Sequence, residues 1–85
     1  MTNTSVITRI DELLDRYESG RATVWDVESQ FEMHLTALEG LSSRQVDQAR
    51  DLVHRLVLAS MEETPSAAPA EALDHLRSFV RDLPR

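Results

Sequence analysis

The few helix-breaking residues of this chain divide it into four short segments, and their spacing limits the fold more than any other feature. Gly20, Gly40 and Pro65 each close a segment, and Pro84 closes the last one. No segment alternates apolar and polar residues with period two, and no Asn-Gly or Asp-Gly pair marks a β-hairpin. Each segment instead has room for a helix of about four turns. The spacing therefore predicts an all-α protein.

The apolar residues of each segment recur every three or four positions, which is the period of an amphipathic helix. This pattern predicts helices over residues 5–19, 23–40, 43–60 and 70–83. The side chains that form the inward stripes are, in chain order, Val6, Ile10, Leu13 and Tyr17; Val24, Val27, Phe31, Leu35 and Leu38; Val46, Ala49, Val53, Leu56 and Ser60; and Leu73, Leu76, Val80 and Leu83.

Capping residues stand where these helices are expected to begin and end. Thr23 is a good N-cap with Asp26 three residues later, and Ser42 with Gln45 forms a capping-box pattern. Gly20 suits the left-handed conformation that ends many helices.

The expected architecture is a small antiparallel bundle of three helices with a fourth helix tied on. Residues 1–63 form the three-helix unit, residues 64–69 a Pro/Ala-rich linker and residues 70–83 the C-terminal helix, all within one domain spanning residues 1–85. The linker leaves two alternatives open, since the fourth helix can dock on its own chain or on a neighbouring copy.

The composition excludes several classes of protein. The net charge is −6, all nine basic residues are arginines, and there is no cysteine for a disulfide, a thiolate nucleophile or a Cys-based zinc site. An acidic chain is a poor phosphate binder. No apolar run approaches the roughly 20 residues that span a bilayer, and the N-terminus lacks a secretory signal. These features, with exclusive use of arginine, favour a cytoplasmic bacterial protein without a membrane partner.

No arrangement of residues indicates catalysis, and we expect no enzyme, cofactor or metal. His34, His54 and His75 lie on three different segments without a repeated Glu-x-x-His unit. His54 and His75 fit solvated positions, and His34 fits a partly buried structural one. The serines lack a Gly-x-Ser-x-Gly elbow, and two isolated glycines cannot form a phosphate-binding loop.

The turn between the second and third segments permits a DNA-binding alternative. Gly40, Leu41 and Val46 have the spacing of a helix-turn-helix. Residues able to read base edges would then follow, namely Arg44, Gln45 and Gln48. The net charge and the absence of a basic patch argue against nucleic acid as the partner.

The second helix carries the strongest indication of a binding surface. On a helical wheel Glu28, Glu32 and Glu39 fall within roughly 40° of arc, with Trp25 beside them. An aromatic anchor next to carboxylates favours a basic protein partner. The alternative for Trp25 is a core position over the end of the bundle, which is the more usual place for a lone tryptophan.

Two apolar residues, Met33 and Leu58, project from the polar sides of their helices. Exposed apolar side chains in so small a protein favour self-association or a docking site for the fourth helix. A homodimeric structural subunit is therefore a third alternative.

One resemblance lies in the stretch from Leu13 to Thr23, followed by Val27, Glu28 and Phe31. This pattern resembles the opening of small bacterial colicin-immunity-like proteins, with an apolar helix, a Ser-Gly-basic turn and an acidic-aromatic second helix. The resemblance covers about twenty residues. It implies an acidic helical bundle that blocks a basic nuclease toxin, and hence an immunity- or antitoxin-like inhibitor.

Overall fold

A computed structural model describes residues 2–62 and 66–84. Four helices account for most of this part of the chain: α1 (Asn3–Glu18), α2 (Val24–Ala37), α3 (Ser43–Ser60) and α4 (Ala68–Arg81). No strand occurs within the described residues. The prediction of an all-helical protein is confirmed.

Side-chain caps fix the starts of α1, α2 and α3, whereas the N-cap of α4, Ala67, makes no side-chain cap bond. Thr23 Oγ1 accepts the Asp26 N–H at 3.2 Å, and Asp26 Oδ2 accepts the Thr23 N–H at 2.9 Å. Ser42 and Gln45 exchange the same pair of bonds at 3.1 and 2.9 Å. The capping box of Ser42 and Gln45 is therefore present as predicted, and Thr23, predicted as an N-cap, forms a second capping box with Asp26. Each box satisfies amide groups that a helix start leaves free. The first helix begins two residues earlier than expected because Thr2 caps it.

A glycine ends α1 in the way that its position predicted. Gly20 has φ +80°, the left-handed region that L side chains avoid. Its N–H donates to the Tyr17 carbonyl at 3.1 Å, and the Arg21 N–H donates to the Arg16 carbonyl at 2.7 Å. This pair of bonds is a Schellman motif, which satisfies the last carbonyls of the helix and turns the chain toward α2.

Besides the start of α1, three predicted boundaries are wrong. The second helix ends at Ala37 rather than near Gly40, because Leu38 adopts an extended conformation and reaches the core from the loop. The fourth helix begins at Ala68 with Pro69 in its first turn, so the last two residues assigned to the linker are helical. It ends at Arg81, although Leu83 is still buried beyond it. Residues 64 and 65 of the predicted linker, and residue 63 at the end of the predicted three-helix unit, lie outside the described residues.

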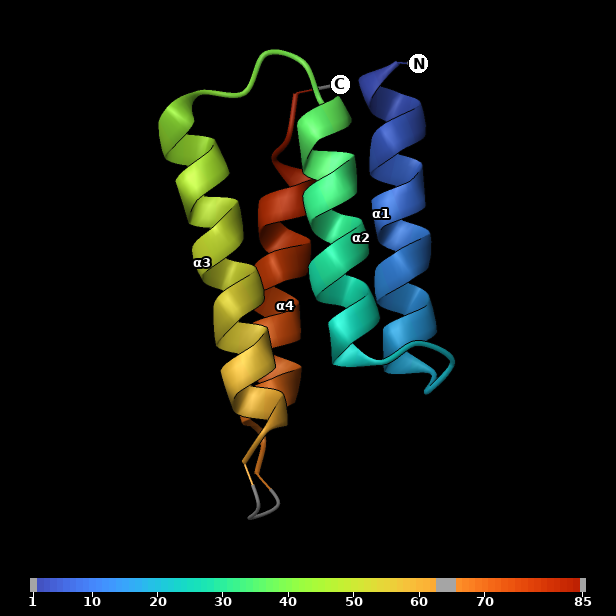
Figure 1. Cartoon of the computed structure of the whole chain (residues 1–85), viewed down its shortest axis with the longest axis vertical. Coiled ribbons are helices and arrows are strands. Elements are labelled where there is room, and N and C mark those ends of the chain that lie inside the picture. The colour runs from blue at the N-terminus through green and yellow to red at the C-terminus, as the bar shows by residue number, and fades with distance from the viewer. Residues whose placement is uncertain (1, 63–65, 85) are drawn as a thin grey trace.

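Each helix packs against two others and runs opposite to them (Figure 1). α1 contacts α2 and α4, and α3 contacts the same two helices from the other side. α4 thus packs on its own chain. The four inward stripes form a single core, whose largest members that are less than 2% exposed are Phe31, Ile7, Ile10, Leu13, Leu14, Leu56, Leu76, Val6, Val27 and Val80.

Polar side chains link neighbouring segments at each of the two ends of the molecule. At the end where the chain termini meet, Asn3 Nδ2 donates to the Glu39 carbonyl at 2.8 Å and to the Pro84 carbonyl at 3.0 Å. Asn3 Oδ1 accepts the Glu39 N–H at 2.9 Å. At the other end, the Tyr17 hydroxyl and Ser60 Oγ lie 2.8 Å apart and link α1 to α3.

Candidate interaction site between α2 and α3

The exposed large apolar side chains of the molecule are concentrated on two of its helices. Trp25 and Met33 lie on α2, Leu58 lies on α3, and Met61 is the C-cap of α3. Each is more than half exposed, whereas the described residues of α1 and α4 include no exposed large apolar side chain. The layer formed by α2 and α3 is thus the face that leaves apolar surface in contact with water. The positions predicted for Met33 and Leu58 are confirmed.

A groove of about 260 Å³ runs between α2 and α3. Its floor is apolar and buried, and its rim is polar. The residues that line it are Glu28, Phe31, Glu32, Leu35, Arg50, Val53 and His54. A groove with an apolar floor and a few polar rim groups is the usual form of a recognition site.

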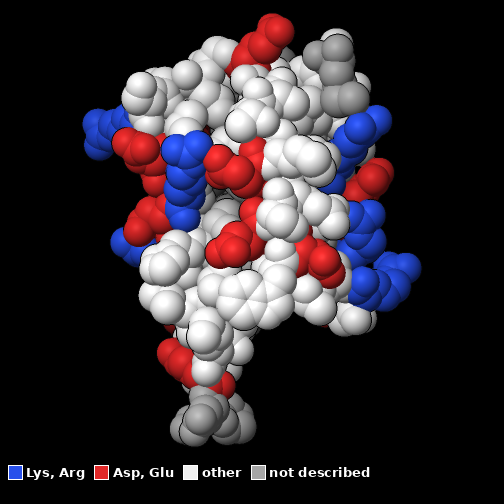
Figure 2. Space-filling view, in the orientation of Figure 1, with Lys and Arg blue, Asp and Glu red and all other residues white. Residues whose placement is uncertain are grey.

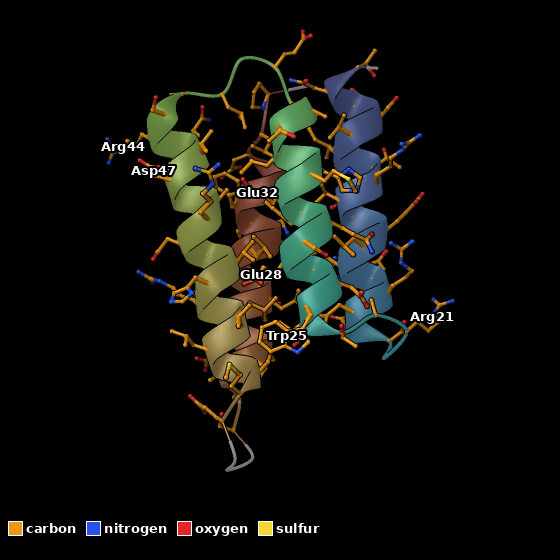
Figure 3. The ribbon with its side chains drawn as sticks, in the orientation of Figure 1. Arg21, Trp25, Glu28, Glu32, Arg44 and Asp47 are labelled. Carbon is orange, nitrogen blue, oxygen red and sulfur yellow. The ribbon has the colours of Figure 1, made fainter. Side chains whose placement is uncertain are left out.

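Trp25 lies at one end of this groove, one helical turn before Glu28 (Figure 3). Its side chain is 55% exposed, so it does not fold into the core, and the interpretation of Trp25 as a core residue is wrong. The physical reason is that Val24, Val27 and Phe31 already fill the inward side of α2. Trp25 lies a quarter turn away from that side and is left on the surface.

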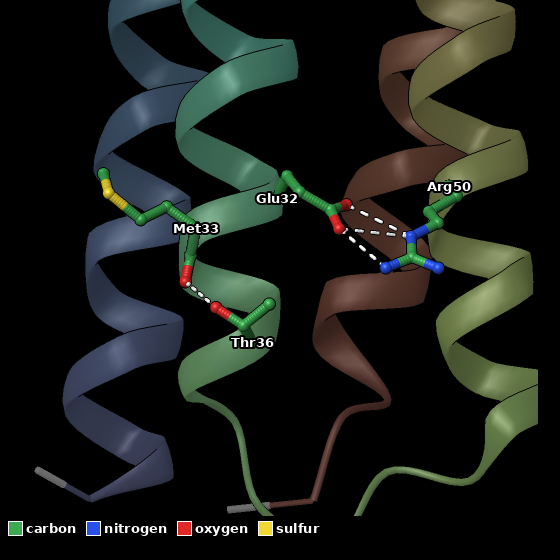
Figure 4. A network of polar contacts seen from close by, with 4 residues as sticks. All are labelled: Glu32, Met33, Thr36 and Arg50. Carbon is green, nitrogen blue, oxygen red and sulfur yellow. Dashed lines mark hydrogen bonds and ion pairs between the residues drawn. The ribbon is translucent and has the colours of Figure 1, made fainter.

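Glu28 and Glu32 follow Trp25 along the same side of α2, facing α3 (Figure 3). Glu32 is paired: Arg50 Nη2 donates to Glu32 Oε1 at 2.7 Å, and Arg50 Nε lies 3.2 Å from both carboxylate oxygens (Figure 4). The hydrogen bonds from Arg50 lower the pKa of the Glu32 carboxyl. Glu28 forms no ion pair with any residue in the described part of the chain. Glu28 can therefore attract an external cation more strongly than Glu32 can.

Glu39 does not belong to this row. It was placed on the wheel of the second helix, but that helix ends at Ala37 and Glu39 lies in the following loop. Its backbone is held by Asn3 at the end of the molecule opposite Trp25. The structure brings Trp25, Glu28 and Glu32 together and separates Glu39 from them.

The charge pattern of this face follows from the absence of basic residues on α2. In Figure 2 the middle of the face, over α2, carries uncharged side chains and acidic side chains. Most basic side chains lie toward the edges of this face. Arg50, on α3, is the basic residue of the groove lining, and Glu32 holds it. The central strip therefore presents an apolar floor with the free carboxylate of Glu28.

The residues of the DNA-binding alternative are arranged differently from those of a helix-turn-helix. α2 and α3 lie side by side and antiparallel (Figure 1), whereas the helices of that motif cross at about 90–120°. Gln45 Oε1 accepts the Ser42 N–H in the capping box. Arg44 and Gln48 are exposed, and Arg44 points away from α2 (Figure 3). DNA binding stays a prediction that this geometry does not favour.

The histidines do not form a second site. His54 and His75 are exposed, and His34 is half-buried beside α1. Burial, followed by the charges of Arg9 and Arg16, lowers the pKa of His34. Within the described residues no three histidine, aspartate or glutamate side chains are grouped as metal ligands. Over the same residues, no helix has the length and apolar character needed to cross a membrane.

Compared with models of protein families, with curated proteins and with solved structures, the chain matches none. The site is therefore defined by its own geometry. Sequence reasoning missed the pairing of Glu32 with Arg50. The sequence places both residues at the margin of an apolar stripe, but only the packing of α2 against α3 brings them together.

Proposed function

We propose that this chain is a non-enzymatic interaction protein that binds a basic protein partner through the groove between α2 and α3. The observation that carries the proposal is the half-exposed Trp25 beyond one end of an apolar groove, one turn from the free carboxylate of Glu28, which lines the groove (Figure 3). Aromatic side chains in such positions provide much of the binding energy of protein interfaces.

The charge of the molecule favours a basic partner. A net charge of −6 attracts a positively charged protein over long distances and accelerates the encounter. Near contact, Glu28 is the principal carboxylate, because Arg50 already neutralises Glu32. We assign Trp25 and Glu28 as the main partner-binding residues, with Glu32 in a secondary position.

The proposed class of protein is an immunity- or antitoxin-like inhibitor in a bacterial cytoplasm. The resemblance of the first two helices to colicin-immunity-like proteins supports it, as does the acidic composition. The four helices act in this proposal as one antiparallel bundle and one domain, with α4 joined through a Pro/Ala-rich linker. α4 contacts α1 and α3 and so holds both outer helices in place.

The test is a comparison of the proteins captured from a lysate of the source cells by the wild-type chain and by three variants. We expect a basic protein that is retained at low salt and released at moderate salt, because screening weakens attraction between exposed charges. Trp25→Ala and Glu28→Gln should each reduce its recovery. Glu39→Gln removes the same charge outside the groove and should not.

Equal recovery by Glu28→Gln and Glu39→Gln would remove the groove from the proposal. Recovery of DNA would favour the helix-turn-helix alternative through Arg44, Gln45 and Gln48. Recovery of the chain alone, together with dimeric mass in solution, would favour the homodimeric subunit.

A further inference from the structure

We propose that the groove between α2 and α3 takes up an amphipathic helix of the partner, which places an arginine against Glu28 and an apolar side chain beside Trp25. This inference rests on the proposed function and adds the conformation of the bound segment and the position of its cation.

The helical conformation of the bound segment follows from the backbone of the two helices that form the groove walls. Both walls of the groove are helices, whose backbone hydrogen bonds are made internally. An extended segment would therefore find no backbone partners there, and the described residues contain no strand edge to which it could add. A helix satisfies its own backbone and presents side chains every three or four residues. From Glu28 to Leu35 the groove wall on α2 is about 10 Å long, enough for about two turns of a ligand helix, and Trp25 lies one turn further along.

The partner's arginine is placed at Glu28 because Glu32, the other carboxylate of the groove, already has an ion-pair partner. Glu32 already receives three close contacts from the guanidinium of Arg50. Glu28 has no ion-pair partner in the described chain, and it lies on the same groove, whose floor includes Phe31 and Val53. An arginine of the partner can bond Glu28 with its planar fork while its aliphatic stem covers that floor.

The apolar contact belongs at the Trp25 end of the groove. Trp25 is in the first turn of α2, and Leu58 and Met61 lie in the last turn and at the C-cap of α3. α2 and α3 are antiparallel neighbours, so the start of α2 and the end of α3 lie toward the same end of the molecule (Figure 1). Trp25, Leu58 and Met61, which belong to these two helix ends, are all exposed. A leucine of the ligand helix, one or two turns from the arginine, reaches this end.

The experiment uses a labelled, alanine-based helical peptide with leucine and arginine on one face at a spacing of three and four residues. The control peptide has the same composition, with those residues distributed around the helix. Binding to the full chain is followed at low salt by fluorescence anisotropy. Trp25 is the sole tryptophan, so its emission should shift to shorter wavelength when the patterned peptide binds. The control peptide should bind at least several-fold more weakly.

Matched variants locate the bound peptide. Glu28→Gln should raise Kd about three- to five-fold, whereas Glu39→Gln should leave it unchanged. Trp25→Ala should raise Kd about tenfold or more, and Met33→Ala, which removes an exposed apolar residue outside the groove, should not. Arg50→Gln frees Glu32 and should lower Kd. Arg44→Gln makes the same charge change on α3 but points away from α2, so its effect should be smaller.

Equal binding of the two peptides, or equal effects within any of the three matched pairs of groove and control variants, would overturn the inference. The chain eluting as a dimer that Trp25→Ala converts to a monomer would overturn it too, because a second copy would then cover the groove. If a protein is captured through Trp25 and Glu28 but the patterned peptide does not bind, the helical ligand is wrong and the proposed function stands.

Discussion

Individual side chains decide where the loops and ends of this molecule lie, and Asn3 is the clearest case. Its amide joins three segments that are far apart in the sequence: the start of α1, the loop after α2 and the tail after α4. Nothing in the sequence around Asn3 predicts this role, because its partners are backbone groups of Glu39 and Pro84. A backbone group carries no residue-specific signal that a pattern can reveal.

Replacing Asn3 by alanine should lower the free energy of unfolding by about 1 kcal/mol, because three hydrogen bonds at a partly exposed position are lost together. For a domain of this size, that change lowers Tm by about 4–8 °C. Thermal unfolding followed by circular dichroism measures it. Thr8→Ala is the control, since Thr8 bonds only the Thr4 carbonyl within its own helix. Equal Tm values for the two variants would contradict the role given to Asn3.

His34 makes the stability of the fold depend on pH near neutrality. Burial and the charges of Arg9 and Arg16 hold its pKa below the ordinary value of 6.5. The folded state therefore binds fewer protons than the unfolded state as pH falls below 6.5, so the free energy of unfolding decreases until the folded-state pKa is passed. We expect the wild type to lose stability between pH 7.5 and pH 5.5 relative to His34→Gln. Denaturant titrations at several pH values test this, and parallel curves would show that His34 does not contribute.

At the scale of the helices, α2 differs from α1 and α4. α1 and α4 bury their large apolar residues on one side, whereas α2 buries Val27, Phe31 and Leu35 and exposes Trp25 and Met33 elsewhere on its surface. Helical periodicity predicted all four helices and most of the core. It could not place Trp25, because a position a quarter turn from the inward stripe is buried or exposed according to what the next helix covers.

Residues 1–63 were expected to form a three-helix unit of their own. That expectation gave α4 a smaller part in the core than it has in the structure. Leu73, Leu76 and Val80 of α4 are buried in the common core, and the helix covers both α1 and α3. A chain ending at residue 62 should therefore lose cooperative thermal unfolding and near-ultraviolet circular dichroism. Leu76→Ala in the full chain should cost about 2–5 kcal/mol but keep a cooperative transition. A truncated chain that unfolds cooperatively as a monomer, with a Tm near that of the full chain, would restore the three-helix unit.

At the scale of the whole molecule, the described residues have a Cα radius of gyration of 12.4 Å, close to the ~12 Å of a compact domain of this length. The net charge and the distribution of arginines were evident from the sequence. The neutralisation of Glu32 by Arg50 was not, because these residues are 18 positions apart and meet only when α2 and α3 pack side by side. The same packing creates the groove and leaves Glu28 as its free carboxylate.

The sequence by itself determined the helical class, the capping boxes at Thr23 and Ser42, the left-handed turn at Gly20 and the inward stripes. These features depend on residues within about four positions of one another, so local periodicity and capping chemistry suffice to predict them. Only the tertiary structure decided the end of α2, the exposure of Trp25 and the different states of Glu28 and Glu32. Each of these depends on which surfaces the packed helices cover, and that is settled by contacts between residues far apart in the chain.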